Sequence, residues 1–296
     1  MITLTDFRKI DDEVQNAIAS TLDGIKTSAK EGYILYLANG DYRKELDNPS
    51  SKLNPNVIDY QGYLHLDETR LKFLEGFLKT FYSFPRIKLT LWGKFLSIFN
   101  SALKKSISDE RTVPDDELRM NIEFMIYSHT WESENFLKDL YRLAILVDTG
   151  NYAWNIEVPP MGKHDFIRKN IRDTFKKKNN PITNIITKSF HTSIRNAFAH
   201  SQYYFNAHNK TIWLDNYKGA SWELRNLSFD EWTKRFVYST LLTYYMLNIK
   251  HENKFNIAKD FGTNIFTIAL PPNSKNVNIV YDSRRKVFNF ETQYKA

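Results

Sequence analysis

The chain has 296 residues, a net charge of +7 and no cysteine, which excludes disulfides, thiol catalysis and cysteine-ligated zinc and favours a reducing cytoplasm. Hydrophobic residues make up 42% of the chain while glycine and proline are scarce, so we expect a packed, mainly α fold with small β-hairpins. The charged N-terminus has no signal-peptide pattern and no apolar run reaches about 18 residues, so we expect a cytoplasmic protein without a membrane span.

Residues 1–114 are predicted to form a helical N-terminal region, whose role the sequence does not specify. Thr5 and Asp6 are of the types that cap a helix, and they stand at the start of the first apolar repeat. The polar stretch 105–117 is the best internal boundary, because Pro114 followed by acidic residues is typical of a helix start. The predicted helices of this region span 3–30, 67–83 and 87–107.

Residues 115–254 are predicted to form a second helical region. Its first helix, 115–148, ends before Gly150, and a later helix begins after the capping box of Ser228 and Glu231. The expected helices span 115–148, 163–178, Pro181 to His200 and about 229–250. The expected buried side of the first of them consists of Met125, Leu137, Leu140, Ala144 and Val147.

Short apolar runs separated by turn residues predict two β-hairpins. The first joins 203–205 to 211–214 through a polar turn. The second joins the alternating residues 277–281 to 287–290. It belongs to a C-terminal extension, 255–296, that we expect to pack on the helices.

The motif Ile-Arg-Asn-Ala-Phe-Ala-His at residues 194–200 carries the most specific chemistry of the chain. Arg195 offers a permanently charged fork of donors, and His200 exchanges a proton near neutral pH. No other arginine has a histidine four to seven positions downstream. Arg195, Asn196 and His200 can therefore bind a phosphodiester and move its protons, so we expect neither a metal nor another cofactor.

The spacing within the motif sets a geometric problem. At about 100° per residue, Arg195 and His200 lie about 140° apart on a straight helix and about 7.5 Å apart along its axis. Either the helix ends between them or a second surface completes the site. Asn196 lies four residues before His200, and it could orient the imidazole or bind phosphate.

These residues resemble the hallmark of the HEPN domain (higher eukaryotes and prokaryotes nucleotide-binding), which has an arginine, a polar residue next to it and a histidine a few residues later. The resemblance covers roughly residues 115–250 and implies a HEPN-like helical bundle. Many HEPN proteins are toxins or abortive-infection effectors of antiviral defence that cleave RNA without a metal, with two motifs facing each other in a homodimer. The resemblance therefore implies an RNA substrate and a homodimer, and it leaves open an antitoxin or sensor partner.

By position, the resemblance implies an endoribonuclease site made of Arg195, Asn196 and His200. His200 would be general base or acid for attack by the RNA 2′-hydroxyl, and Arg195 would stabilise the charge that develops on phosphorus. The products would carry 2′,3′-cyclic phosphate and 5′-hydroxyl ends. The alternatives are a non-catalytic HEPN-like module that binds RNA or protein, and a purely structural bridge at a helix end.

A basic run precedes the motif. Residues 163–178 carry seven positive and two negative side chains, which favours contact with RNA, although a solvated helix face has the same composition. Tyr203 could stack a base or pack within its hairpin. The candidate RNA-binding residues are Lys169, Arg172, Lys176, Lys177, Lys178 and Tyr203. The polar residues that could support the motif from nearby are His129, Glu132, Glu134 and His191.

Overall fold

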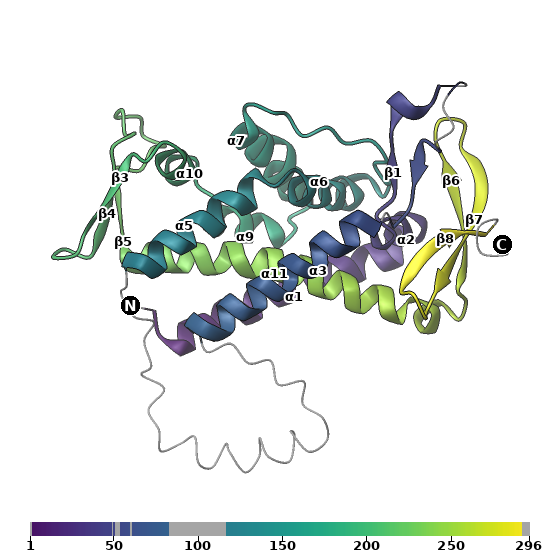
Figure 1. The fold of residues 1–296 in the computed structure, drawn as a ribbon, viewed down its shortest axis with the longest axis horizontal. Helices are drawn as coiled ribbons and strands as arrows, with labels where there is room; N and C mark the ends of the chain where they lie inside the picture. The colour runs from purple at the N-terminus through teal and green to yellow at the C-terminus, as the bar shows by residue number, and fades with distance from the viewer. Residues whose placement is uncertain (1, 49, 51–53, 60, 83–116, 292–296) are drawn as a thin grey trace, which may run out of the picture.

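The computed structural model describes residues 2–48, 50, 54–59, 61–82 and 117–291. It is mainly helical, with small antiparallel sheets (Figure 1). The expected helix over 87–107 lies outside the described residues. The helices that precede the motif are α1 (Leu4–Ser28), α2 (Lys30–Leu37), α3 (Gln61–Tyr82), α5 (Glu117–Glu132), α6 (Glu134–Thr149), α7 (Lys163–Asp165), the π-helical segment η2 (Phe166–Arg172) and α8 (Asp173–Lys177). They are followed by α9 (Ile182–Ser189), α10 (Thr192–Ala199) and α11 (Phe229–Phe261).

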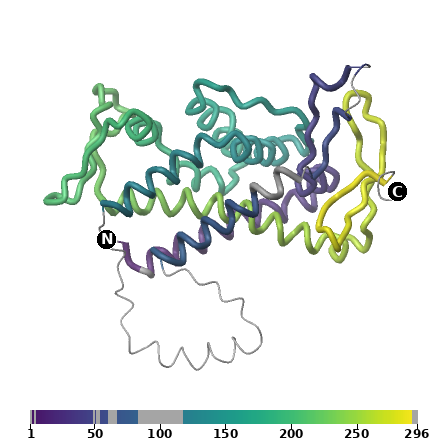
Figure 2. The backbone as a smooth tube through the Cα atoms, in the orientation of Figure 1, coloured from purple at the N-terminus to yellow at the C-terminus, as the bar shows by residue number. Residues whose placement is uncertain are grey.

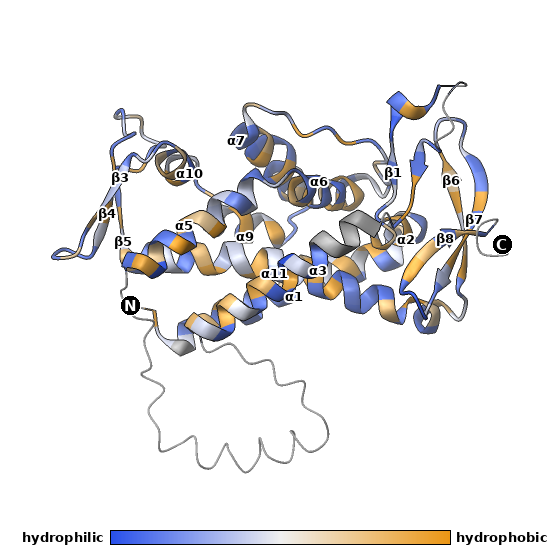
Figure 3. Ribbon diagram, in the orientation of Figure 1, coloured by the Kyte–Doolittle hydropathy of each residue, from blue (hydrophilic) through white to orange (hydrophobic). Residues whose placement is uncertain are grey.

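Helix α11 forms the centre of the molecule. Every residue from 236 to 247 is buried, because α1, α3, α5 and α9 pack around this stretch. Blue and orange alternate along the surrounding helices, as expected for elements with one face toward a core (Figure 3). The predicted capping box of Ser228 and Glu231 starts the helix. The helix extends past the expected end at 250, because the first residue suited to end it is Gly262, whose φ is 66°.

Helix α1 confirms the first predicted helix but not its cap. Thr3, and not Thr5, accepts the amide hydrogen of Asp6, whose carboxylate accepts the amide hydrogen of Thr3 in return. The helix runs beside α11 in the same direction, with Glu13 against Tyr238 and Lys26 against Asp260 (Figure 2). Residues of the N-terminal region therefore share a hydrophobic core with the helices that follow residue 115.

The expected helix over 115–148 is two helices, α5 and α6. The chain breaks at Ser133, whose hydroxyl accepts the amide hydrogen of Phe136 as the cap of α6. Of the expected buried side, Leu137, Leu140 and Ala144 are fully buried. Met125 is 55% exposed, because the break leaves α5 free to turn this position away from the core of α6.

The expected helix from Pro181 to His200 is also interrupted. Phe190 and His191 are extended, and they separate α9 from α10. The amide of His191 donates to the buried hydroxyl of Tyr127, and the Phe190 ring packs on Trp131. Contacts with α5 therefore outweigh the helical pattern at this point, and the motif lies on a short helix of its own.

Both predicted hairpins are present, each extended by a strand that the pattern did not predict. Strand β3 (Tyr203–Asn206) pairs with β4 (Thr211–Leu214), and β4 pairs with β5 (Asn226–Ser228). Strand β7 (Lys275–Asp282) pairs with β8 (Val287–Phe290) and with β6 (Ile265–Leu270). These sheets lie at opposite ends of α11 (Figure 1). A third, two-stranded sheet joins β1 (Asp41–Tyr42) to β2 (Asn56–Val57), with the short 3-10 helix η1 (Lys44–Leu46) between them.

Within the described ranges, none of the helices combines the length and the apolar character needed to cross a membrane.

Candidate functional site

The motif occupies helix α10 and the residue that ends it. Ile194 and Ala197 are fully buried and fix the helix against α5, while the Arg195 side chain is 24% exposed and His200 is exposed. The apolar positions of the motif thus anchor the helix, and its polar positions lie at the surface. Because His200 is exposed, its ring is accessible to a substrate.

The end of α10 decides where His200 lies. The amide of Gln202 donates to the Ala197 carbonyl at 2.7 Å, and that of Ser201 donates to the Phe198 carbonyl at 3.0 Å. These two bonds form a Schellman motif, in which Ser201 takes the left-handed conformation with a φ of 53°. His200 is the C-cap, so the helix ends at the residue itself and not between Arg195 and His200.

Arg195 is held by Glu132 at the end of α5. Its guanidinium donates to one carboxylate oxygen of Glu132, and Lys163 on α7 donates to the other at 3.0 Å. Lys163 also donates to the Glu132 backbone carbonyl at 3.0 Å. The Glu132 side chain is 36% exposed, so two cations converge on one anion near the surface. Glu132 was among the residues predicted to support the motif, but no pattern in the sequence connects it to Lys163.

Asn196 acts on Arg195 instead of on the His200 ring. Its side-chain oxygen accepts a hydrogen bond from the Arg195 guanidinium at 2.8 Å. Its contact with His200 is through the backbone, where the His200 amide donates to the Asn196 carbonyl at 3.1 Å. Glu132 and Asn196 together therefore fix the orientation of the guanidinium.

His191 caps the N-terminus of α10. Its Nδ1 accepts the amide hydrogen of Ser193 at 3.2 Å, which requires a neutral ring. Burial, reinforced by the charges of Arg235 and Arg168, lowers the pKa of His191 to about 4. The ring is therefore neutral at pH 7, and its contribution is to start the helix that carries Arg195.

The basic run forms the expected helix, in the three segments α7, η2 and α8. Lys169 pairs with Asp165 at 2.8 Å, and Arg172 pairs with Asp173 at 2.8 Å. Lys176, Lys177 and Lys178 are exposed, and the last two lie 3.7 and 3.8 Å from Asp148. The three lysines at the end of α8 are thus exposed, and Lys177 and Lys178 lie farther from their carboxylate than Lys169 and Arg172 lie from theirs.

Tyr203 lies within an aromatic cluster. Its ring stacks on Phe124 at 5.0 Å between centroids, and it lies 5.7 Å from both Phe198 and Phe205. Its hydroxyl donates to the Asn121 side chain at 2.8 Å. These contacts fix the β3–β5 sheet to α5 and account for Tyr203 by packing.

An apolar groove of about 580 Å³ lies between α3 and α5, and it ends at Glu132. Phe73 and Met125 in its lining are both 55% exposed. The groove was not predicted from the sequence, because the helical periodicity placed Met125 in the core.

Comparisons with protein-family models, with curated proteins and with solved structures found no match for this chain. Among the described residues, no group of three or more histidine, aspartate or glutamate side chains is arranged to hold a metal ion.

Proposed function

We propose that this chain is a HEPN-type endoribonuclease that cleaves RNA by attack of the 2′-hydroxyl, without a metal in the catalytic step. The observation that carries the proposal is the convergence of Arg195 and Lys163 on one carboxylate, beside a helix that ends at an exposed His200. Two cations that share one anion mark a position that an RNA phosphate can occupy in place of Glu132.

In the proposed reaction the 2′-oxygen forms a bond to phosphorus and the bond from phosphorus to the 5′-oxygen breaks. One imidazole takes the proton of the 2′-hydroxyl, and a second gives a proton to the leaving 5′-oxygen. Arg195 stabilises the charge that develops on the phosphoryl oxygens. Each chain supplies one motif histidine, so a homodimer that brings His200 of two copies to one phosphate provides both the acid and the base.

The test is incubation of the purified chain with total RNA and EDTA, followed by mapping of the product ends. We expect 2′,3′-cyclic phosphate and 5′-hydroxyl ends, and DNA should survive because it lacks the 2′-hydroxyl. His200→Ala should slow cleavage by roughly 10²–10⁴-fold. Because His200 is exposed, its removal should leave the melting temperature nearly unchanged.

The matched control is His208→Ala, which removes another exposed imidazole, in the turn between β3 and β4. This variant should cleave like the wild type. Cleavage that EDTA abolishes, or that survives in His200→Ala, would contradict the proposal.

A second function, RNA binding without catalysis, is favoured by the exposed Lys176, Lys177 and Lys178 at the end of α8. In that case their replacement by glutamate would remove RNA binding and its salt dependence, while His200→Ala would leave affinity intact. A role as a toxin or abortive-infection effector, with or without an antitoxin or sensor partner, is part of the first proposal. It predicts that expression of the wild type, but not of His200→Ala, arrests growth.

A further inference from the structure

A small cavity with a charged lining lies between α3, α6, α11 and the segment that joins α2 to β1. Helix α10 lies toward the opposite end of the molecule from α2 and β1 (Figure 1), but Arg70 lines both this cavity and the groove that ends at Glu132. Its volume is about 60 Å³, which admits only a small molecule. Both signs of charge and a few apolar side chains line it.

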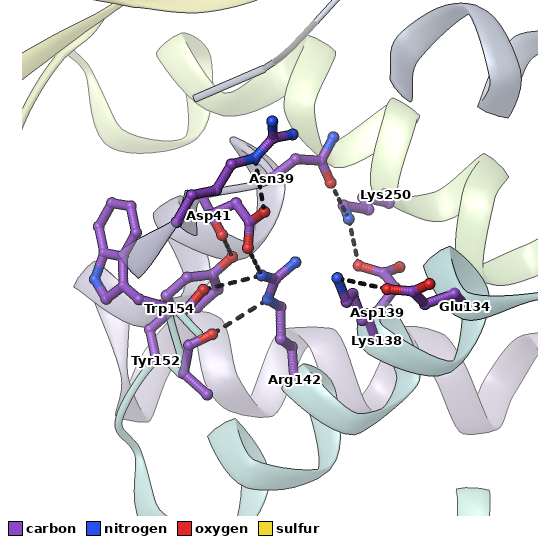
Figure 4. Close-up of polar contacts among 12 residues, drawn as sticks. Asn39, Asp41, Glu134, Lys138, Asp139, Arg142, Tyr152, Trp154 and Lys250 are labelled. Atoms are coloured by element: carbon purple, nitrogen blue, oxygen red, sulfur yellow. Dashed lines mark hydrogen bonds and ion pairs between the residues drawn. The ribbon is translucent and has the colours of Figure 1, made fainter. Parts of the chain in front are cut away.

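Most of the charges at this cavity already have partners (Figure 4). Arg142 donates to Asp41 at 2.6 Å and to the backbone carbonyls of Ala153 and Trp154. Lys250 donates to Asn39 at 2.5 Å and to Asp139 at 2.6 Å. These bonds hold the charged side chains of Arg142 and Lys250 in the lining of the cavity.

Two charged residues of the lining lack ion-pair partners of this kind. Asp67 and Arg70 lie one turn apart on α3, where the charge of each stabilises the charge of the other, but in the described part of the chain neither lies within 4.0 Å of an opposite charge. Arg70 donates only to the neutral hydroxyls of Ser133 at 3.1 Å and Thr130 at 3.4 Å, and its guanidinium lies over the Phe136 ring. Burial raises the pKa of Asp67 to about 6, while the charge of Lys250 lowers it. The carboxylate is therefore largely ionised at pH 7.

The chemistry of the missing partner follows from this pair. A guanidinium binds a carboxylate through two parallel hydrogen bonds, and a carboxylate forms an ion pair with an ammonium group. An anion alone would be repelled by Asp67, and a cation alone would be repelled by Arg70 and Lys250. A molecule with adjacent ammonium and carboxylate groups satisfies both side chains at once.

We propose that this cavity binds a small α-amino acid. The carboxylate of the ligand pairs with Arg70, its ammonium group pairs with Asp67, and its side chain lies against Phe136, Met246 and Leu247. A volume of this size fits glycine best, alanine and serine need a small expansion of the cavity, and valine tests the upper limit of size. No residue of the motif lines the cavity, so the proposal does not depend on the proposed ribonuclease activity.

The experiment is isothermal titration of the full-length chain with each of these four amino acids at concentrations up to about 1 mM. We expect at least one of them to bind. The N-acetyl derivative of that amino acid, which lacks the ammonium group, and its carboxamide, which lacks the carboxylate, should each bind at least tenfold more weakly. These analogues test the proposal on the unaltered protein.

Asp67→Asn and Arg70→Gln should each weaken binding at least tenfold. Glu68→Gln and Lys72→Gln are matched controls, since both are exposed positions on the same helix and should bind like the wild type. Failure of all four amino acids to bind would overturn the proposal. Binding of inorganic phosphate in their place, or equal binding of the two analogues, would overturn it as well.

Discussion

A buried ion pair between α3, α5 and α11 offers the sharpest stability prediction. Glu123 is fully buried and accepts hydrogen bonds from Arg119, from the Tyr82 hydroxyl and from the Trp232 indole, the last at 2.9 Å. Arg119 is 2% exposed and also donates to the Tyr82 hydroxyl at 3.0 Å. The pair therefore joins the helix that carries Glu132 to the central helix of the core.

Replacing Arg119 with methionine keeps most of the side-chain volume and leaves Glu123 buried without its cation. Burial raises the pKa of Glu123 to about 7 even beside Arg119, so the variant must either bury an unpaired charge or protonate this carboxyl group. Removing one partner of a buried pair costs about 3–5 kcal/mol, a large fraction of the stability of an ordinary domain. We expect this loss in the free energy of unfolding.

The double variant Arg119→Met, Glu123→Gln also removes the unpaired carboxylate of Glu123. The glutamine oxygen still accepts a hydrogen bond from Tyr82 or Trp232, so the double variant should be more stable than Arg119→Met alone. The recovery should be about 1–3 kcal/mol, the cost of an unsatisfied buried group.

The assay is urea unfolding of both variants and the wild type. The urea concentrations at the unfolding midpoints are compared, provided that the free energy of unfolding has the same dependence on urea in all three proteins. A double variant that is as unstable as, or less stable than, Arg119→Met would refute the reasoning. It would mean that the cost comes from lost packing and not from an uncompensated charge.

Three further predictions concern the helix of the motif. Ser201→Gly should stabilise the protein by about 1 kcal/mol, since glycine adopts the left-handed conformation without strain; thermal unfolding measures this, and a lower melting temperature would contradict it. His191→Asn keeps a capping acceptor that does not titrate. Because the folded pKa of His191 is about 4 and the unfolded value is about 6.5, the unfolded state binds more protons between these limits, so wild-type stability falls as the pH drops through this window. The variant should lose less stability than the wild type over this pH window. Equal slopes of stability against pH for the two proteins would count against the capping role. Glu132→Gln frees Arg195 and Lys163 for phosphate, so the slope of log affinity for single-stranded RNA against log salt should steepen by about 0.7 for each further phosphate that these two cations neutralise. An unchanged slope would argue against a phosphate at this position, and this last prediction rests on the proposed function.

Local patterns in the sequence were sufficient for most helices and both hairpins. Apolar periodicity predicted α1, and the Ser228–Glu231 box predicted the start of α11, because capping and helical spacing depend only on nearby residues. The motif itself was also visible, since Arg195, Asn196 and His200 lie within six residues of the chain.

Tertiary contacts decided the features that join distant segments. The break at Phe190–His191 depends on the contacts of these residues with Tyr127 and Trp131 of α5. The break at Ser133 has a local cap, and Arg70 of α3 donates to the hydroxyl of that cap. The meeting of Arg195 with Glu132 and Lys163 needs three helices in place. No spacing in the sequence encodes such a contact, because the geometry of a site between helices is set by the core that holds the helices together and not by the residues of any one of them.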